Sequence, residues 1–275
     1  MKNIGQLTSA FRTKVWFGLV TPSEGQNTMN EAAGFCDLHC HLLYNLDDGA
    51  KTLEDSLAMG RLLVDLGFSA AAPSPHNRPE YASLKEALHR LNDVQIAFNS
   101  AGIDLKLVKN SENFFLDELL IGNLCSDRAR LINAGPYLLV EAPYFSPLPA
   151  LNDLIFRMRL KGITPLIAHP ERCFEFERKG RAAEAVAAGA LLQLDIGALV
   201  GRYGPTAKKL AQRWLDEELY AVGATDLHSP RGAEKWVAPS MDALRKQVGE
   251  RRMRSLMADR PHRIILGQPL ESSRD

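Results

Sequence analysis

The stretch "FCDLHCHLLYNLDDGAKT", residues 35–52, places two histidines and two aspartates directly after a short apolar run. His39 and His41 stand one residue apart, and Asp47 and Asp48 follow shortly afterwards. Ionisable side chains are costly to bury unless they are paired or bind a metal, so a core is not normally filled in this way. The stretch therefore indicates a strand that leads into a polar site.

Downstream, compact apolar runs alternate with amphipathic segments. Strands buried on both faces are expected at residues 34–40, 69–75, 105–111, 137–143, 164–170, 191–197 and 220–226. Helices are expected at residues 52–67, 79–102, 150–162, 180–189, 205–219 and 239–250. The first helix has Thr52 and Asp55 in a near-capping arrangement. Repeated βα units of this kind predict an α/β fold, either an open parallel sheet or a barrel.

Residues that suit a metal site stand at the carboxyl ends of these expected strands. A single histidine or glutamate there is usually structural, but five of the seven histidines share such positions with two glutamates and one aspartate. Because parallel strands end on one face, we expect these side chains to converge, which favours the barrel. They are His39, His41, His76, Glu112, Glu141, His169, Asp226 and His228. His89 and His262 fall outside the pattern and are interpreted as structural or surface residues.

Imidazole and carboxylate ligands without thiolate suit Mn, Zn or Fe. The supply of ligands exceeds the need of one ion, so two or three divalent ions with shared carboxylates are expected. Arg78, Arg172 and Arg231 each lie within three residues of an expected ligand. The planar fork of arginine matches phosphate geometry, so these residues point to a phosphate-bearing substrate.

A family resemblance is carried by "DLHCHLLYNLDDGAKTLEDS", which is similar to the opening of the PHP (polymerase and histidinol phosphatase) superfamily. More narrowly, it resembles the bacterial manganese-dependent tyrosine phosphatases of capsule and exopolysaccharide loci. "SPHNRPEY", "YLLVEAPY", "KGITPLIAHPER", "LQLDIGAL", "GATDLHSPRG" and "PHRIILGQ" continue the similarity in order, over about residues 35–270. The resemblance implies a distorted (β/α)7 TIM-like barrel of the PHP type.

Carried over by position, the resemblance also implies three groups of metal ligands. The first ion would be bound by His39, His41, Glu112 and Asp226, the second by Glu112, Glu141 and His169, and the third by Asp48, His76 and His228. Asp47 is adjacent to Asp48, and the sequence leaves open which of the two is the ligand.

The resemblance further implies the residues that act on the substrate. Arg172 and Arg231 match phosphate-binding, catalytic arginines, and Asp48 is counted with them as catalytic. Arg231 follows His228 at a slightly shorter spacing than the family leads us to expect. Arg78 is a weaker candidate for binding the phosphate or the tyrosyl peptide.

The implied reaction is metal-assisted hydrolysis of phosphotyrosine, with manganese favoured and Fe or Zn as alternatives. The implied substrate is the phosphotyrosine tail of a bacterial tyrosine kinase that regulates capsular or exopolysaccharide synthesis. Other hypotheses are another PHP phosphoesterase, such as a histidinol-phosphate phosphatase, a TatD-like metal-dependent nuclease, and a non-catalytic metal-binding module. A cysteine-dependent phosphatase is disfavoured, because it needs an arginine after five intervening residues, and Leu46 occupies that position after Cys40.

The bulk properties fit this interpretation. A net charge of zero offers no general attraction to nucleic acid or anionic membranes. The cysteines form no C-x-x-C pair and indicate reduced thiols in a cytoplasmic protein; they are Cys36, Cys40, Cys125 and Cys173. Residues 1–34 are expected to be a leader, because their apolar run "KVWFGLV" is too short for a signal or a membrane span. Residues 35–275 are expected to form one phosphatase domain, and the oligomeric state is not indicated.

Overall fold

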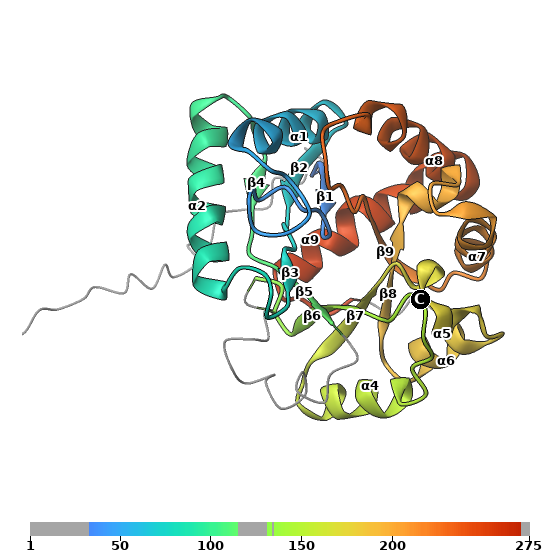
Figure 1. Ribbon diagram of the computed structural model, residues 1–275. Helices are drawn as coiled ribbons and strands as arrows, with labels where there is room; N and C mark the ends of the chain where they lie inside the picture. The colour runs from blue at the N-terminus through green and yellow to red at the C-terminus, as the bar shows by residue number, and fades with distance from the viewer. Residues whose placement is uncertain (1–32, 115–130, 134, 271–275) are drawn as a thin grey trace, which may run out of the picture. The chain divides into compact units, whose positions relative to one another are not determined.

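The computed structural model describes residues 33–114, 131–133 and 135–270, and every strand pairing within these ranges is parallel (Figure 1). One sheet has the order β1-β2-β4, and the other has the order β3-β5-β6-β7-β8-β9. The strands are β1 (Phe35–Asp37), β2 (Phe68–Ala71), β3 (His76–Asn77), β4 (Lys106–Leu107), β5 (Glu112–Phe114), β6 (Tyr137–Glu141), β7 (Thr164–Ala168), β8 (Leu191–Asp195) and β9 (Tyr220–Ala224).

The second and third expected strands end earlier than predicted, and each is followed by a further short strand just beyond its expected end, so the strands form two sheets. The second strand stops at Ala71 and resumes at His76, with Pro73 and Pro75 in the gap. Proline has no N–H to donate to a ladder, so regular pairing ends there. The third strand is also interrupted, between β4 and β5, although no proline lies there.

Contacts beyond the strand ends join β1 to β9. The Asp226 N–H donates to the His39 carbonyl at 2.8 Å, and the His41 N–H donates to the Leu227 carbonyl at 2.8 Å. The buried carboxylate of Asp37 accepts from the Thr225 N–H at 3.2 Å. The expected α/β fold is therefore confirmed, although its distorted barrel is not closed by one continuous ladder.

All six expected helices are present. They are α1 (Leu53–Asp65), α2 (Leu84–Ser100), α4 (Leu151–Leu160), α6 (Arg181–Ala187), α7 (Gly204–Asp216) and α8 (Val237–Arg254). The Thr52–Asp55 capping box forms as expected, and a second box between Ser83 and Glu86 starts α2 later than predicted. Short segments not predicted from the sequence are η1 (Pro170–Arg172), α5 (Phe174–Glu177), η2 (Ile196–Val200), η3 (Ala233–Lys235), η4 (Ser255–Asp259) and α9 (Arg260–Ile265).

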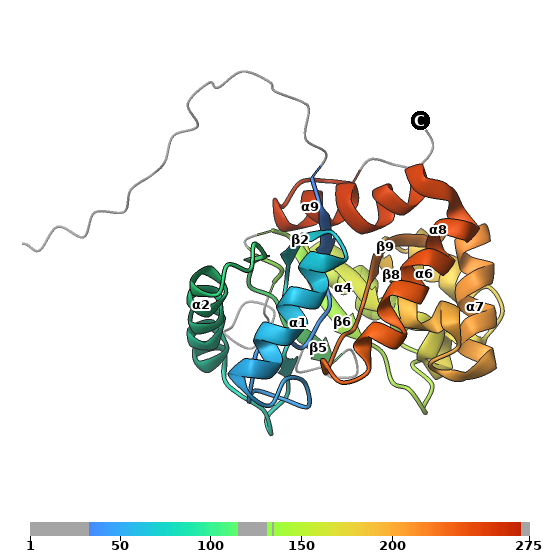
Figure 2. The same cartoon turned by 90° about the horizontal axis from the view of Figure 1, so that it is seen from above.

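The position of α9, the last helix, indicates which end of the strands is open to polar side chains. Ile264 and Ile265 of α9 are buried in one apolar cluster with inward-facing residues such as Leu139 and Leu166. Figure 2 shows α9 beside the start of β1, so it covers the amino ends of the strands. The carboxyl ends are left for polar side chains.

The outer faces of the strands pack against the helices. Leu138, Val140 and Ile167 alternate with the inward residues and belong to the larger apolar cluster that includes Trp214 of α7. In the part of the chain that the structure describes, no helix has both the length and the hydropathy needed to cross a membrane. The leader lies almost wholly outside the described ranges, as does Cys125, and the domain boundary stays a prediction.

Candidate metal and phosphate site

The strand ends bring the predicted ligands together. Glu141 closes β6, His76 and Glu112 open the short strands β3 and β5, and the remaining ligands follow β1, β7 and β9. Four overlapping groups of these side chains have ligand atoms within 4.8 Å of one another. Residues 39 and 228, far apart in the sequence, thus share one site.

The first ligand group that the resemblance implies comprises four residues from after β1, the start of β5 and after β9: His39, His41, Glu112 and Asp226. The Nε2 atom of His39 lies 3.2 Å from Oδ1 of Asp226 and 3.5 Å from Oε1 of Glu112. The Nε2 atom of His41 lies 3.4 Å from the same Asp226 oxygen and 3.9 Å from Oε2 of Glu112. Two imidazoles and two carboxylates therefore converge as the resemblance implies.

Glu112 also reaches the neighbouring group. Its Oε1 atom lies 3.3 Å from Nε2 of His169, whose Nε2 is 3.8 Å from Oε1 of Glu141. Its other oxygen lies 2.9 Å from Nδ1 of His76. One buried carboxylate thus stands between two groups of histidines, the position that a bridging ligand needs.

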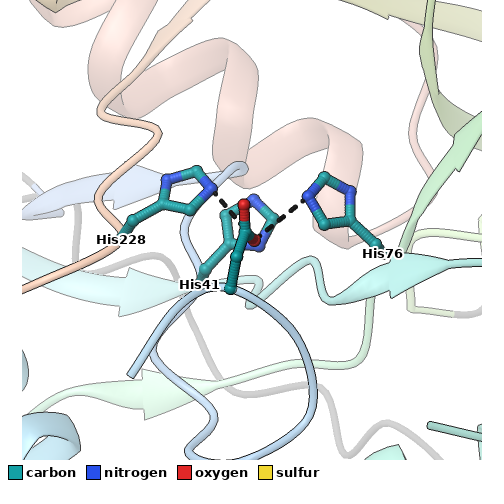
Figure 3. A group of neighbouring side chains, drawn as sticks. His41, His76 and His228 are labelled. Atoms are coloured by element: carbon teal, nitrogen blue, oxygen red, sulfur yellow. Dashed lines mark ion pairs between the residues drawn. The ribbon is translucent and has the colours of Figure 1, made fainter. Parts of the chain in front are cut away.

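The third group lies at the mouth of the site. His41, His76 and His228 point toward one another in Figure 3. The Oδ1 atom of Asp48 lies 3.3 Å from Nε2 of His76 and 3.5 Å from Nε2 of His228. The Asp48 side chain is 56% exposed, so this group is open to solvent.

Asp47 plays a different part from Asp48. Its Oδ2 atom accepts a hydrogen bond from Nδ1 of His41 at 2.7 Å and from the His76 N–H at 3.1 Å. Its Oδ1 atom accepts from the Gly49 N–H at 2.9 Å. Asp48, not Asp47, therefore faces the histidine pair, and Asp47 orients His41 from behind.

The side chains of the site are suitable ligands for divalent metal ions. Oε1 of Glu112 and Oδ1 of Asp226 are buried and accept no hydrogen bond from any described residue. Burial alone lowers the pKa of His39, but the Glu112 and Asp226 carboxylates outweigh it and raise that pKa to about 10. Buried carboxylate oxygens without donors are costly, and a cation shared with neutral imidazoles satisfies them.

Two of the predicted ligands hold unusual backbone conformations. His169 has φ of 32° and Asp226 has φ of 51°, in the left-handed region that residues other than glycine rarely adopt. Such strain persists only where surrounding structure enforces it, and it is frequent at functional sites.

Some residues of the site were not predicted from the sequence. Oε1 of Gln193 accepts from Nδ1 of His39 at 2.9 Å, which leaves Nε2 of His39 to face the carboxylates. Gln193 is buried in the middle of β8, and a polar residue in an apolar run was the available signal. Asp37, also buried, accepts from the His39 N–H at 3.1 Å.

Arg172 lies beside the first group. Its Nη1 atom donates to Asp226 at 2.5 Å and to Asp195 at 3.1 Å, and its Nη2 atom donates to the Tyr144 hydroxyl at 2.9 Å. The guanidinium carbon is 4.1 Å from the ring centre of Tyr203. The two aspartates raise the pKa of Arg172 despite its burial, so this cation is fixed at the edge of the site.

The other two expected arginines differ from Arg172. Nη2 of Arg78 donates to Oε2 of Glu141 at 2.6 Å, so Arg78 holds a predicted ligand in the structure. The Arg231 side chain is exposed and makes no polar contact with the residues described. Of the three arginines, Arg172 alone is hydrogen-bonded to Asp226, a predicted ligand of the first group.

Residues 35–266 match the family model described as capsular polysaccharide synthesis, CpsB/CapC. The chain belongs to the CpsB/CapC family. The resemblance drawn from the sequence motifs is thereby confirmed.

Similar proteins agree with this membership. "Tyrosine-protein phosphatase YwqE" of Bacillus subtilis (strain 168) is 29% identical over 219 residues, which span 78% of this chain and 85% of that protein. A solved structure described as "YwqE from Bacillus subtilis and CpsB from Streptococcus pneumoniae, unique metal-dependent tyrosine phosphatases" superposes with a TM-score of 0.79. It is 24% identical and covers 86% of this chain and 96% of its own.

A histidinol phosphate phosphatase from Lactococcus lactis subsp. lactis, solved with zinc, L-histidinol and phosphate, is a more distant match. Its TM-score is 0.54 at 12% identity, covering 80% of this CpsB/CapC chain and 93% of its own. At that identity the likeness concerns the fold alone.

Proposed function

We propose that this chain is a metal-dependent phosphatase that hydrolyses phosphotyrosine. The observation that carries the proposal is the position of Glu112, a buried carboxylate between two groups of histidines, with the Arg172 cation at the edge of the same cluster. The names of the family relatives, tyrosine-protein phosphatases, support the choice of substrate.

Nine residues are proposed as metal ligands. They are His39, His41, Asp48, His76, Glu112, Glu141, His169, Asp226 and His228. Two or three divalent ions, with Mn favoured, would be held in this set. When bound, such ions neutralise charge on phosphate oxygens and make water a stronger nucleophile near neutral pH.

The chain's own residues would bind and orient the phosphate group. Arg172 is already desolvated and clamped by Asp195 and Tyr144, so a phosphate that meets it would do so with little further ordering of the side chain. Asp48 lies on the open side, where the substrate would enter. Arg231 is free to turn toward the phosphate, and Arg78 is assigned mainly to holding Glu141.

The leaving group needs little help. A tyrosyl oxygen departs as a phenolate of pKa about 10, which is a far better leaving group than an alkoxide. No covalent phosphoenzyme is required, and the thiols of Cys40 and Cys173 are buried with pKa values raised by that burial. The three cysteines described are therefore structural.

The natural substrate is proposed to be the phosphotyrosine tail of a bacterial tyrosine kinase that regulates capsular or exopolysaccharide synthesis, in the cytoplasm. Membership of a capsular polysaccharide synthesis family supports this context. No partner chain is needed to complete the cluster, because all nine proposed ligands come from one chain.

The test is phosphate release by chelator-treated protein, with and without added Mn²⁺, from a phosphotyrosyl peptide and from histidinol phosphate. The proposal expects metal-dependent release from the peptide and a much lower kcat/KM for histidinol phosphate. Preference for histidinol phosphate would move the protein to small-molecule metabolism. Release that persists in the His39→Ala variant would exclude the cluster as the site.

A further inference from the structure

Two phenylalanines lie exposed beside the candidate site. Phe145 follows β6 and is 94% exposed, and Phe174 follows η1 and is 44% exposed. A single exposed apolar side chain is ordinary and needs no explanation. Here, however, the Phe174 N–H donates to the Tyr144 carbonyl at 3.2 Å, so the start of α5, which carries Phe174, is hydrogen-bonded to the loop that carries Phe145.

Tyr144 connects these phenylalanines to the metal cluster. Its ring stacks on that of His169, with centres 5.6 Å apart and 19° between the planes. Its hydroxyl accepts from Arg172 at 2.9 Å and lies 3.4 Å from Nε2 of His169. The ring of Phe145 is centred 6.1 Å from the ring of Tyr144.

The rings of Tyr144 and Phe145 therefore form an aromatic surface that runs outward from the predicted phosphate position, and Phe174 is joined to it through its backbone hydrogen bond to Tyr144. In an aryl phosphate the ring is bonded to the ester oxygen, so it must lie next to whatever surrounds the phosphate. Arg172 and His169 mark that position, and Tyr144 is the side chain in contact with both. An alkyl phosphate has no ring to place against this surface.

We propose that Phe145 and Phe174 contact the aryl ring of the substrate and so select aryl over alkyl phosphomonoesters. This inference rests on the proposed function and names the residues that would recognise phosphotyrosine. Rings that pack against each other attract one another beyond the effect of their buried area. Loss of both side chains is expected to lower preference for an aryl substrate about tenfold.

The experiment compares Phe145→Ala, Phe174→Ala and the double variant with the wild-type protein. A matched control is Phe156→Ala, because Phe156 is 57% exposed and lies on α4, which carries none of the nine proposed ligands. The substrates are a phosphotyrosyl peptide, the same peptide with phosphoserine, and phenyl phosphate. All three phenylalanines are substantially exposed, so melting temperatures close to that of the wild type are expected.

The proposal expects kcat/KM to fall about tenfold for phenyl phosphate and for the phosphotyrosyl peptide in the double variant. It expects no change for the phosphoseryl peptide and no change in Phe156→Ala. An equal loss for aryl and alkyl substrates, or no loss, would overturn it. A loss confined to the peptide would also overturn it, since the contact would then be to the flanking residues.

Binding separates this inference from the proposed function. Phenylphosphonate and methylphosphonate differ by the ring and are not hydrolysed, so their affinities for the Mn²⁺-loaded protein can be compared by calorimetry. The wild type is expected to prefer phenylphosphonate, and the double variant to lose that preference. Such a result without phosphotyrosine hydrolysis would reject the function and keep the aryl-binding surface.

Discussion

Replacing Asp47 with alanine should weaken metal binding although Asp47 is not proposed as a ligand. Its carboxylate accepts hydrogen bonds from His41 Nδ1, the His76 N–H and the Gly49 N–H. Loss of a carboxylate that orients a ligating histidine typically lowers metal affinity by about 10–100-fold. At a Mn²⁺ concentration about 100 times the wild-type Kd, metal stabilises the wild type by about 2.7 kcal/mol and the variant by about 0.4–1.4 kcal/mol.

The metal-free protein should also lose stability. Three donors, the His41 ring and the N–H groups of Gly49 and His76, lose their acceptor, at about 1 kcal/mol each. A loss of about 3 kcal/mol in the free energy of unfolding corresponds to roughly 6–12 °C in Tm for a domain of this size. Asp48→Ala is the matched comparison, because Asp48 is exposed and its removal should lower metal content without lowering the metal-free Tm.

The assay is thermal unfolding of both variants across a Mn²⁺ titration, with bound metal measured by elemental analysis. If Asp47→Ala matches the wild type both in metal-free Tm and in the gain in Tm on adding Mn²⁺, Asp47 does not orient His41. If Asp48→Ala shows the large metal-free loss instead, the roles given to the two aspartates are reversed.

Three further predictions concern neighbouring residues. Arg172→Ala should raise KM for a phosphotyrosyl peptide while metal content stays near wild type, and a parallel loss of metal would make the arginine structural. Gly49→Ala should lower the free energy of unfolding by about 1–3 kcal/mol, because the added Cβ would lie 2.2 Å from the His41 carbonyl oxygen. A Tm equal to that of the wild type would contradict this close approach. Gln193→Ala leaves Nδ1 of His39 without its acceptor and should weaken Mn²⁺ binding about 10–100-fold, measured by calorimetry; unchanged affinity would show that Gln193 does not orient the ligand.

Much of the fold follows from local pattern. The alternation of apolar runs and amphipathic helices predicted the seven strand segments and the six main helices because burial on both faces and capping boxes are local features. The break between β2 and β3 was not predicted, although Pro73 and Pro75 were visible in the sequence. The position of α9 over the amino ends depends on tertiary packing of Ile264 and Ile265, which no local pattern specifies.

The site was predictable to the extent that topology places strand ends together. Backbone contacts beyond the ends of β1 and β9 bring His39 to Asp226, and only a parallel, barrel-like order makes that contact expected from sequence. The residues that orient the ligands were missed because they lie within strands, as Gln193 and Asp37 do. Their roles depend on which side chain each one is hydrogen-bonded to. The periodicity of the sequence predicts the face of the strand on which a residue lies, but not its hydrogen-bond partner.

The most direct test of the cluster's catalytic role is the rate of phosphate release from a phosphotyrosyl peptide as Mn²⁺ is returned to chelator-treated protein, with bound metal counted in the same samples. Turnover should appear as two to three ions bind per chain, and Asp226→Asn should neither bind the full complement nor turn over. Full activity in the metal-free protein, or in Asp226→Asn, would contradict the assignment of the cluster as the catalytic site.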